Sequence, residues 1–295
     1  MKNCPIMKRM KTNYEHRNQT FLTRRTPVIM RIDGKAFHTY TRGLQKPFDV
    51  GLIEDMNNTA IYLCQQIQGS KIAFVQSDEI SILITDYDRL ETNAWFDYSV
   101  QKMTSIAASL ATAKFNQLRL SRHLSEIWDT DADNETILNL FSNNIDKLPT
   151  ANFDCRVFNI PKEEIANYFL ARQKDTVKNS IASVAQSLYS HKELEGKNGN
   201  EQQEMIFQKG INWNDFPSGH KRGRTVVKQT YVNGELFPPE DNSVFEENGS
   251  YFKISPIVSG EVMTHFQLEN PEIISKWELV ETPLNFTDIY FKKWQ

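Results

Sequence analysis

Three acidic residues at the ends of apolar runs are the residues of this chain best placed to do chemistry. The run Lys71–Thr85 consists of two short apolar segments hinged at Asp78 and Glu79, a pattern typical of a β-hairpin with adjacent carboxylates at its tip. A second apolar run, Pro27–Asp33, also ends on a carboxylate and is followed directly by Gly34. Because neighbours along a strand point to opposite faces, only one of Asp78 and Glu79 should point directly at a given site.

A divalent cation would explain why carboxylates are placed at these strand ends. If the two runs are neighbouring strands of one sheet, Asp33 and Asp78 project from the same edge. Two like charges a few Å apart are costly unless a cation lies between them, and oxygen ligands without nearby His or Cys suit Mg²⁺. The residues therefore indicate a magnesium-dependent phosphoryl or nucleotidyl transfer centre. Taken alone, the hairpin tip is better explained as a solvated turn.

Composition and length predict a globular protein with one large core or two modest ones. The chain has 295 residues, of which 39% are hydrophobic and 11% aromatic, and its mean hydropathy is -0.53. No apolar run approaches the roughly 18 residues of a membrane span, and no signal peptide begins the sequence, so we expect no membrane contact and a cytoplasmic location. Cys4, Cys64 and Cys155 are far apart, which argues against a disulfide framework and against a zinc site.

Charge is unevenly distributed along the chain although the net charge is only -3. Lysine and arginine dominate the segments Met1–Arg25 and His220–Lys228, whereas Glu235–Glu261 is mostly acidic. Each basic segment is either a solvated face or a surface that contacts phosphates.

The elements that must position the carboxylates follow from hydrophobic periodicity. Helical spacing predicts helices over Asp49–Gln68 and Trp95–Leu118, and Asn152–Ile160 reads as another strand. Together with Pro27–Asp33 and the Lys71–Thr85 hairpin, the order is β-α-β-β-α-β. This is a split βαβ, ferredoxin-like layout of the α+β class, which polymerase palm domains share.

The remaining segments extend this layout. Arg119–Thr150 is polar and acidic and is interpreted as a surface insertion of a short helix and loops. Lys162–Ser190 is predicted to be a long helix, on which Arg172, Asp175 and Asn179 share one face. The tail from Phe237 onward is predicted to be irregular, with a boundary at Pro238 and Pro239.

Four short motifs, in the same order along the chain, resemble those of the tRNA-His guanylyltransferase family. They are Met30–His38, Lys46–Asp49, Gln76–Glu79 and Arg172–Asp175. The resemblance runs from about Arg9 to Lys228. It implies a polymerase-like palm domain that adds nucleotides to the 5′ end of RNA, in the 3′-to-5′ direction.

The resemblance also implies roles for individual residues. Asp33, the Gly34 carbonyl and Asp78 would hold two Mg²⁺ ions, with Glu79 as a further catalytic residue at the same edge. The residues implied around the nucleotide are Lys35, Ala36, Phe37, His38, Lys46 and Ser77. Those implied to position the RNA and its 5′ end are Arg172, Lys178, Asn179, Lys221 and Arg222. Phe37 or His38 could stack on a base, but Phe37 is also explained as a core residue and His38 as merely polar.

The implied reaction has two stages and defines the expected partners. A 5′-monophosphorylated tRNA is activated by ATP or GTP, and the 3′-hydroxyl of an incoming nucleoside triphosphate then attacks the activated phosphate. This chain departs from the family pattern at a motif that bears on specificity. Where eukaryotic members have His-x-Asn-Asn, this chain has Val177–Ser180, so that only Asn179 of the motif remains. This is similar to the bacterial-type branch, which repairs 5′-truncated tRNAs against a template. Both templated repair and G addition to tRNA-His stay open, and a homotetramer is implied.

Two other functions fit the same residues. A palm-fold nucleotidyl cyclase would also use two aspartates but would not require the basic segments, and a tRNA-binding protein without catalysis would not require intact Asp33, Asp78 and Glu79. Fold alone does not decide among these functions. The expected domains are a palm-like catalytic domain over residues 1–160 with an insertion near 119–150, a helical RNA-positioning region completing the core over 161–235, and a C-terminal extension over 236–295.

Overall fold

The computed structural model describes residues 4–128, 133, 149–232, 235–237, 244–247, 250–254, 265–267, 272–282 and 291. Their contacts divide the chain into two units, one formed by Met1–Val226 with Leu279–Gln295 and the other by Val227–Glu278. Every candidate site residue lies in the first unit. No helix in these described ranges has both the length and the apolar character that crossing a membrane requires.

The predicted α+β fold is confirmed, with helices packed on an antiparallel sheet. The order along the chain is β1 (Val28–Gly34), α3 (Val50–Gln66), β2 (Ser70–Gln76), β3 (Glu79–Ile84), α4 (Val100–Trp128) and β4 (Phe153–Asn159). Across the sheet these strands lie in the order β2-β3-β1-β4, with β1 antiparallel to both β3 and β4. Strand β5 (Arg224–Val232) lies beside β2, and β10 (Ile273–Glu281) beside β5.

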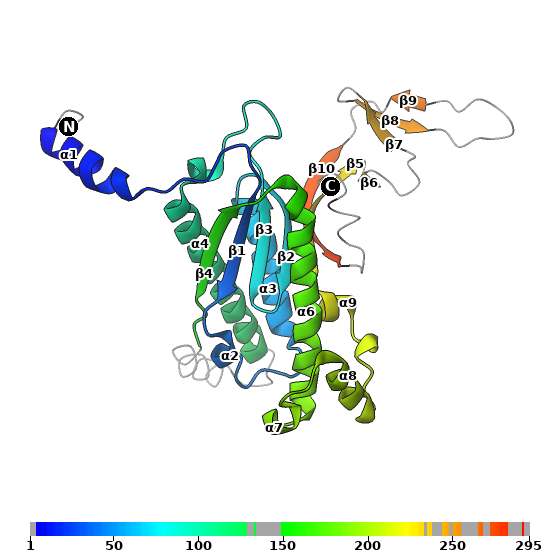
Figure 1. Cartoon of the computed structure of the whole chain (residues 1–295). Helices are drawn as coiled ribbons and strands as arrows, with labels where there is room; N and C mark the ends of the chain where they lie inside the picture. The colour runs from blue at the N-terminus through cyan, green and yellow to red at the C-terminus, as the bar shows by residue number, and fades with distance from the viewer. Residues whose placement is uncertain are drawn as a thin grey trace. The chain divides into compact units, whose positions relative to one another are not determined.

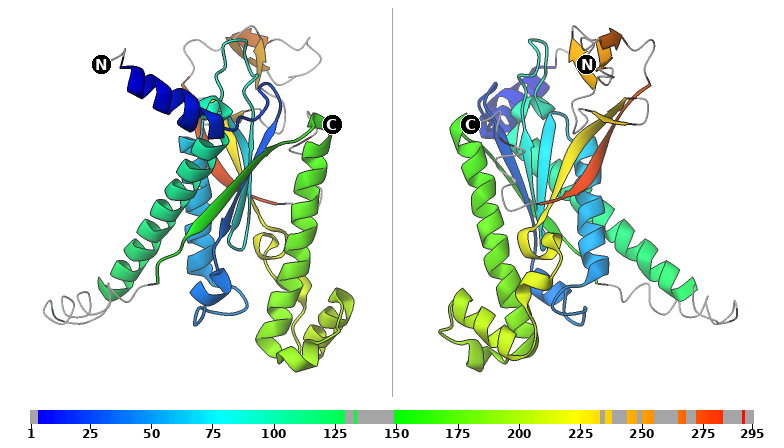
Figure 2. Two further views of the ribbon diagram at one scale, coloured as in Figure 1. Left: turned by 60° about the vertical axis from the view of Figure 1, so that its left-hand side comes forward. Right: turned by 90° about the vertical axis from the view of Figure 1, so that its right-hand side faces the viewer.

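Helices cover both faces of this sheet, as Figures 1 and 2 show. Helices α3 and α4 pack on one face, and α6 (Ile165–Leu188) lies across the other. The alternating residues Val28, Met30 and Ile32 of β1 are fully buried, and β3 is buried at every position because apolar side chains on both of its faces find a helix to pack against. The sheet edge that carries the carboxylates is therefore held by a well-packed core.

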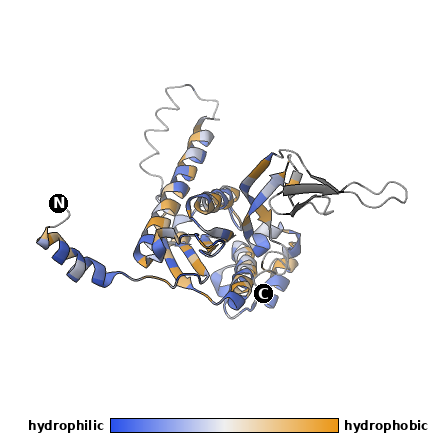
Figure 3. Ribbon diagram, turned by 90° about the horizontal axis from the view of Figure 1, so that it is seen from above, coloured by the Kyte–Doolittle hydropathy of each residue, from blue (hydrophilic) through white to orange (hydrophobic). Residues whose placement is uncertain are grey.

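The other helical segments of the first unit are short in the part of the chain that the structure describes. They are α1 (Pro5–Met10), a π-helical turn at Lys11–Glu15, α2 (Phe37–Tyr40), α7 (His191–Leu194), α8 (Gly199–Gln208), α9 (Ser218–Arg222) and 3₁₀ turns at His16–Asn18, Trp95–Tyr98, Lys162–Glu164 and Trp213–Asp215. Helix α1 mixes apolar and polar residues (Figure 3) and buries none of them.

The predicted helix Trp95–Leu118 differs from the structure at both ends, because Trp95–Tyr98 forms a 3₁₀ turn and α4 begins at Val100. The helix that was expected to end at Leu118, with an insertion beginning at Arg119, continues as α4 to Trp128. The reason is an ion-pair cluster between helices, in which Arg119 and Arg122 of α4 bind the buried carboxylate of Asp55 in α3. Polar residues thus extend the interface between α3 and α4. A prediction from hydrophobic periodicity does not detect them and therefore ends the helix too early. Apart from residues 133, 149 and 150, the rest of the expected insertion lies outside the described residues.

The prediction of an irregular tail is wrong. The structure has β6 (Glu235–Phe237), β7 (Val244–Glu247), β8 (Ser250–Ile254), β9 (His265–Gln267) and β10, and β7-β8-β9 form a separate three-stranded sheet. Most of these strands are three to five residues long, too short for a clear period-two pattern. Long-range contacts stabilise the longer β10, for example the 2.6 Å hydrogen bond from Tyr231 to Glu278.

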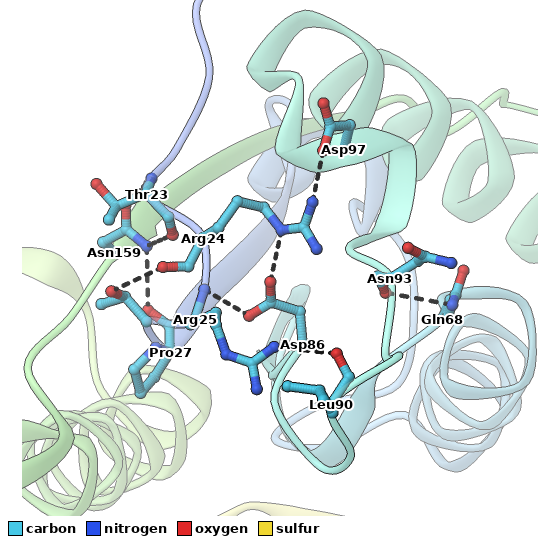
Figure 4. A network of polar contacts seen from close by, with 11 residues as sticks. Thr23, Arg24, Arg25, Pro27, Gln68, Asp86, Leu90, Asn93, Asp97 and Asn159 are labelled. Carbon is cyan, nitrogen blue, oxygen red and sulfur yellow. Dashed lines mark hydrogen bonds and ion pairs between the residues drawn. The ribbon is translucent and has the colours of Figure 1, made fainter.

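Part of the basic N-terminal segment is used to anchor the chain before β1 (Figure 4). Arg24 binds Asp86 at 2.6 Å and Asp97 at 2.7 Å, and the backbone N–H of Arg25 donates to Asp86 at 2.8 Å. The side chain of Asp86 is fully buried, whereas that of Asp97 is 72% exposed. These two arginines therefore have a structural role.

The two carboxylates of this network should differ sharply in their contribution to stability. Asp86→Asn removes a buried charge that accepts two hydrogen bonds, so we expect the free energy of unfolding to fall by about 2 kcal/mol. Asp97→Asn removes an exposed partner of the same arginine and should change it by less than about 0.5 kcal/mol. Urea denaturation followed by circular dichroism measures both values, and equal losses would contradict the assigned anchoring role of Asp86.

Candidate functional site

A cavity of about 460 Å³ lies beside the ends of β1 and of the β2–β3 hairpin. Helix α6 forms one wall, and the loop before α3 together with the start of β5 contributes other residues. The side chains around it are Asp33, Pro47, Phe48, Asp49, Leu52, Ile53, Gln76, Ser77, Asp78, Glu79, Arg172, Asp175, Thr176, Asn179, Ser180, Ala182, Ser183, Gln186, His220 and Arg224. Its volume lies within the usual range for small-ligand sites.

The strand register brings the predicted carboxylates to this cavity. Asp33 pairs with Glu79 across β1 and β3, so the two side chains share a face of the sheet. The N–H of Gly34 donates to the Asp78 carbonyl at 3.1 Å, which holds the hairpin tip against the end of β1. A Cβ atom on Gly34 would lie 2.2 Å from the Phe37 ring, so glycine is required for this approach.

The charge state of Asp78 reflects its crowded surroundings. Burial raises the pKa of Asp78 to about 6, and the nearby charges of Asp33 and Glu79 act in the same direction. Hydrogen bonds from its own backbone N–H and from the Ser77 hydroxyl oppose this shift in part. Arg156 lies 3.8 Å from Asp33, but the two neighbouring carboxylates still oppose the ionisation of Asp78, and a bound cation would relieve this repulsion.

The available donors suit magnesium better than a transition metal. No group of three or more His, Cys, Asp or Glu side chains in the described ranges is arranged to hold a metal ion. Two aspartates would leave most coordination positions to water and to substrate phosphates, as is usual for Mg²⁺. Asp33 and Asp78 therefore fit the predicted cofactor.

Glu79 also lines the cavity, but its carboxylate is already engaged. Arg172 of α6 approaches its two oxygens at 2.9 and 3.0 Å, and the Ser81 hydroxyl donates to it at 3.1 Å. The Glu79 side chain is 10% exposed and that of Arg172 is 19% exposed. This arrangement ties α6 to the carboxylate edge of the sheet, so Glu79 is held as a supporting residue in this geometry.

Helix α6 presents a polar face to the cavity. Arg172 also binds Asp175 at 2.9 Å, and the Asn179 amide donates to the same carboxylate at 3.4 Å. The Thr176 hydroxyl donates to Gln76 at the end of β2. The helical spacing of three and four residues thus places Arg172 and Asn179 beside the carboxylates, whereas Lys178 is exposed and lies outside the cavity lining.

Only some of the residues expected around the nucleotide line a cavity in the structure. Ser77 lines the cavity, with a positive φ of 44° at the hairpin turn. Lys46 lines a neighbouring cavity of about 410 Å³, and Gln186 contributes to both cavities. Lys35, Ala36 and His38 are exposed and lie outside both linings.

Phe37 lies in the core. Its side chain is only 5% exposed, and its ring packs against Tyr40, Phe115 and Phe153 with centroid distances of 4.9 to 5.7 Å. Stacking on a base would require this ring to leave the aromatic cluster.

The basic segment before β5 contributes other residues than those expected. Lys221 is buried, donates to the Asn214 carbonyl and lies over the Trp213 ring, and Arg222 lies outside the cavity lining. Sequence reasoning missed His220 and Arg224, which do line the cavity. The basic run His220–Lys228 indicated that this segment could contact phosphates. It does not reveal which of its side chains face the cavity.

Comparisons with known proteins identify the family of this chain. The family model described as tRNAHis guanylyltransferase matches residues 7–161. A bacterial tRNA(His) guanylyltransferase-like protein solved in complex with ATP is 44% identical, covering 75% of this chain and 88% of its own, with a TM-score of 0.66. Another structure of that description, in complex with GTP, is 35% identical over 99% of both chains, with a TM-score of 0.68.

Similarity extends to eukaryotic enzymes. The tRNA(His) guanylyltransferase of Debaryomyces hansenii is 28% identical, covering 72% of this chain and 77% of its own length. The family match alone spans more than half of the chain. This chain belongs to the tRNA-His guanylyltransferase family of nucleotidyltransferases.

Proposed function

We propose that this protein is a Mg²⁺-dependent enzyme that adds nucleotides to the 5′ end of tRNA in the 3′-to-5′ direction. The observation that carries the proposal is that Asp33 and Asp78 line the same nucleotide-sized cavity, where the charge of Asp33 acts on Asp78. The strand order β2-β3-β1-β4 with intervening helices supports a ferredoxin-like palm. Relatives solved with ATP and with GTP support nucleoside triphosphates as substrates.

The proposed reaction consists of two successive transfer steps. A 5′-phosphate oxygen of the RNA attacks the α-phosphorus of ATP or GTP and releases pyrophosphate, which leaves a 5′-nucleotidyl cap. The 3′-hydroxyl of the incoming nucleotide then attacks the RNA 5′-phosphorus and expels the nucleoside monophosphate. A 5′-triphosphate end would not need the first transfer.

The chain's own residues act in this reaction by holding groups in place. Asp33 and Asp78, with the Gly34 carbonyl, would hold the metal ions, and Arg172 keeps Glu79 fixed beside them. When bound, Mg²⁺ would lower the pKa of the attacking hydroxyl and offset charge on the leaving group. Ser77 and Asn179 offer neutral hydrogen-bonding groups to substrate along the cavity. Positioning and electrostatics suffice for such transfers, so no covalent protein nucleophile is needed.

Templated repair is the form of the reaction that we favour. The motif position that carries His in eukaryotic members is Val177 here, while Asn179 is retained at the cavity. This chain is also more similar in sequence to the two bacterial-type proteins of known structure than to the Debaryomyces hansenii enzyme. We further propose that the region 161–235 positions the RNA, that residues 236–295 extend the catalytic unit, and that the protein is a cytoplasmic homotetramer.

The decisive experiment is extension of a 5′-monophosphorylated tRNA that lacks its first nucleotide. Wild-type protein is incubated with ATP and each labelled nucleoside triphosphate, with Mg²⁺ or with excess chelator. Incorporation that matches the opposing base supports templated repair, and G added regardless of the template supports action on tRNA-His. If no nucleotide is added while tRNA still binds, the protein is a binding protein. Cyclic nucleotide formed without RNA would indicate a cyclase.

Metal affinity should depend on pH in a defined direction. Because the pKa of Asp78 is raised to about 6, this ligand becomes protonated at a higher pH than an ordinary aspartate. We expect the affinity for a divalent ion to approach a decline of about tenfold per pH unit below that pKa. Electron paramagnetic resonance of Mn²⁺ titrated into nucleotide-free protein measures this affinity between pH 5 and 8. A constant affinity across the range would contradict the role of Asp78 as a ligand.

A further inference from the structure

Arg224 is a buried cation at the cavity with one nitrogen that has no partner among the described residues. Its side chain is 7% exposed, its Nε donates to Asn57 at 2.9 Å, and its Nη1 donates to the Gly219 carbonyl at 3.2 Å. The third nitrogen, Nη2, is buried and has no hydrogen-bond partner within the described part of the chain. Since Arg224 lines the cavity, a small rotation of its side chain would bring this unused donor to a ligand there.

The positive charge of Arg224 is not balanced by the residues that the structure places. None of the ion pairs among them includes Arg224, and burial lowers the pKa of its guanidinium to about 10 without an acidic group acting against the shift. Burying an unpaired charge is unfavourable, and an apolar side chain of similar volume would often stabilise the fold as well or better. The two hydrogen bonds therefore do not explain why a full charge is kept at this position.

The backbone fixes Arg224 next to the strand that leads to the carboxylates. The preceding residue, Gly223, has a φ of +86°, and a Cβ atom there would lie 2.4 Å from the Phe74 ring and 3.0 Å from the Val75 carbonyl. Only glycine allows this approach, which packs the start of β5 against β2, and Arg224 lines the cavity together with Gln76 and Ser77.

The other polar groups nearby leave an anion as the fitting partner. The second arginine of the cavity, Arg172, is already bound to Glu79 and Asp175. His220 packs its ring against Phe48 at 4.9 Å, and burial together with the charge of Arg224 lowers its pKa, so it is neutral near pH 7. Arg224 is thus the cation of this lining that has no carboxylate partner among the described residues.

We propose that Nη2 of Arg224 donates to a phosphate oxygen of a nucleoside triphosphate bound in this cavity. The phosphate chain would be held at one point by the Asp33 and Asp78 metal site and at another by Arg224, which makes Arg224 a positioning residue for the nucleotide. Guanidinium groups suit this task because their planar N–H donors match phosphate oxygens. The inference rests on the proposed function, because it takes the cavity as the nucleotide site.

The test compares ligands with and without a triphosphate chain. Isothermal titration calorimetry measures the binding of ATP, AMP and tripolyphosphate to wild type, Arg224→Met and Arg224→Gln, with Mg²⁺ present. For both variants we expect ATP and tripolyphosphate affinity to fall about 10- to 100-fold. Binding of AMP should fall less, so the ratio of ATP to AMP affinity should decrease. Arg89→Met removes an exposed arginine outside the cavity and should leave every affinity unchanged.

The outcomes separate this inference from the proposed function. If wild type binds no nucleotide, the proposed function fails. If wild type binds ATP and the folded variants bind it equally well, the inference about Arg224 fails while the proposed function stands. A melting temperature for each variant shows whether it is folded. If Arg224→Met is not, Arg224→Gln decides, because its amide keeps a donor for the Asn57 and Gly219 oxygens while the charge is lost.

Discussion

Asp78→Asn is expected to abolish nucleotide addition, with a rate at least about a thousandfold below wild type. Asparagine keeps the size and one oxygen of the side chain but removes the charge that would hold the metal ion. Single-turnover incorporation into the truncated tRNA measures the loss. Asp88→Asn is the matched control, because Asp88 is 47% exposed and pairs with Lys71 away from the cavity, so this variant should keep full activity.

Although Asp78→Asn should abolish activity, it should increase the stability of the metal-free protein. A loss of activity could then not be explained by unfolding. Folding raises the pKa of Asp78 from 3.8 to about 6, so the folded protein binds more protons than the unfolded chain between these values. The contribution of this group to stability therefore falls as pH rises from about 4 to 6, and stays unfavourable above. Metal-free Asp78→Asn should be more stable than wild type by about 1–3 kcal/mol near neutral pH, with the difference vanishing near pH 4.

An inactive but less stable Asp78→Asn protein would contradict this account of the site. Activity would then have been lost through folding, and the carboxylate would be a structural group. An active variant would remove Asp78 from the metal site altogether. Chemical denaturation at several pH values, without divalent ions, provides the required comparison.

The central layout could be predicted because its signals are local. Strand β1 and the β2–β3 hairpin are apolar runs with polar ends, and α3 is marked by its periodicity and by Asp49, whose side chain accepts the N–H of Leu52. Because β1 is expected to lie beside the β2–β3 hairpin in one sheet, Asp33 and Asp78 are expected at the same edge of that sheet. That part of the site needed no knowledge of distant contacts.

The parts that sequence reasoning missed depend on residues far apart in the chain. Arg119 and Arg122 extend α4 because they bind Asp55, which lies more than 60 positions earlier. Arg224 reaches the cavity because Gly223 turns the chain against Phe74, and its bond to Asn57 spans 167 positions. A run of basic residues gives no register, so Lys221 and Arg222 were as plausible as Arg224 before the fold was known.

The pair formed by Arg172 and Glu79 leads to the second large expected effect, on stability. Arg172→Met leaves the carboxylate of Glu79 buried without its cation, and we expect the free energy of unfolding to fall by about 3 kcal/mol. Glu79→Gln should cost less, because Arg172 keeps Asp175 as a partner. Lys174→Met, which removes an exposed cation from the same helix, should change stability by less than about 0.5 kcal/mol.

The double variant decides whether the two residues act on each other. If the ion pair is the reason for both effects, Arg172→Met with Glu79→Gln should be more stable than the sum of the single losses predicts, by about 1–3 kcal/mol. Additive losses would show that each residue has separate partners. The resemblance to the family assigned Arg172 to RNA, and that role predicts a different result: stability would be unchanged, while the affinity for tRNA and its dependence on salt would fall. Because Arg172 is 19% exposed and bound to two carboxylates, we expect the loss of stability, with any loss of RNA binding following from the displaced Glu79 and α6.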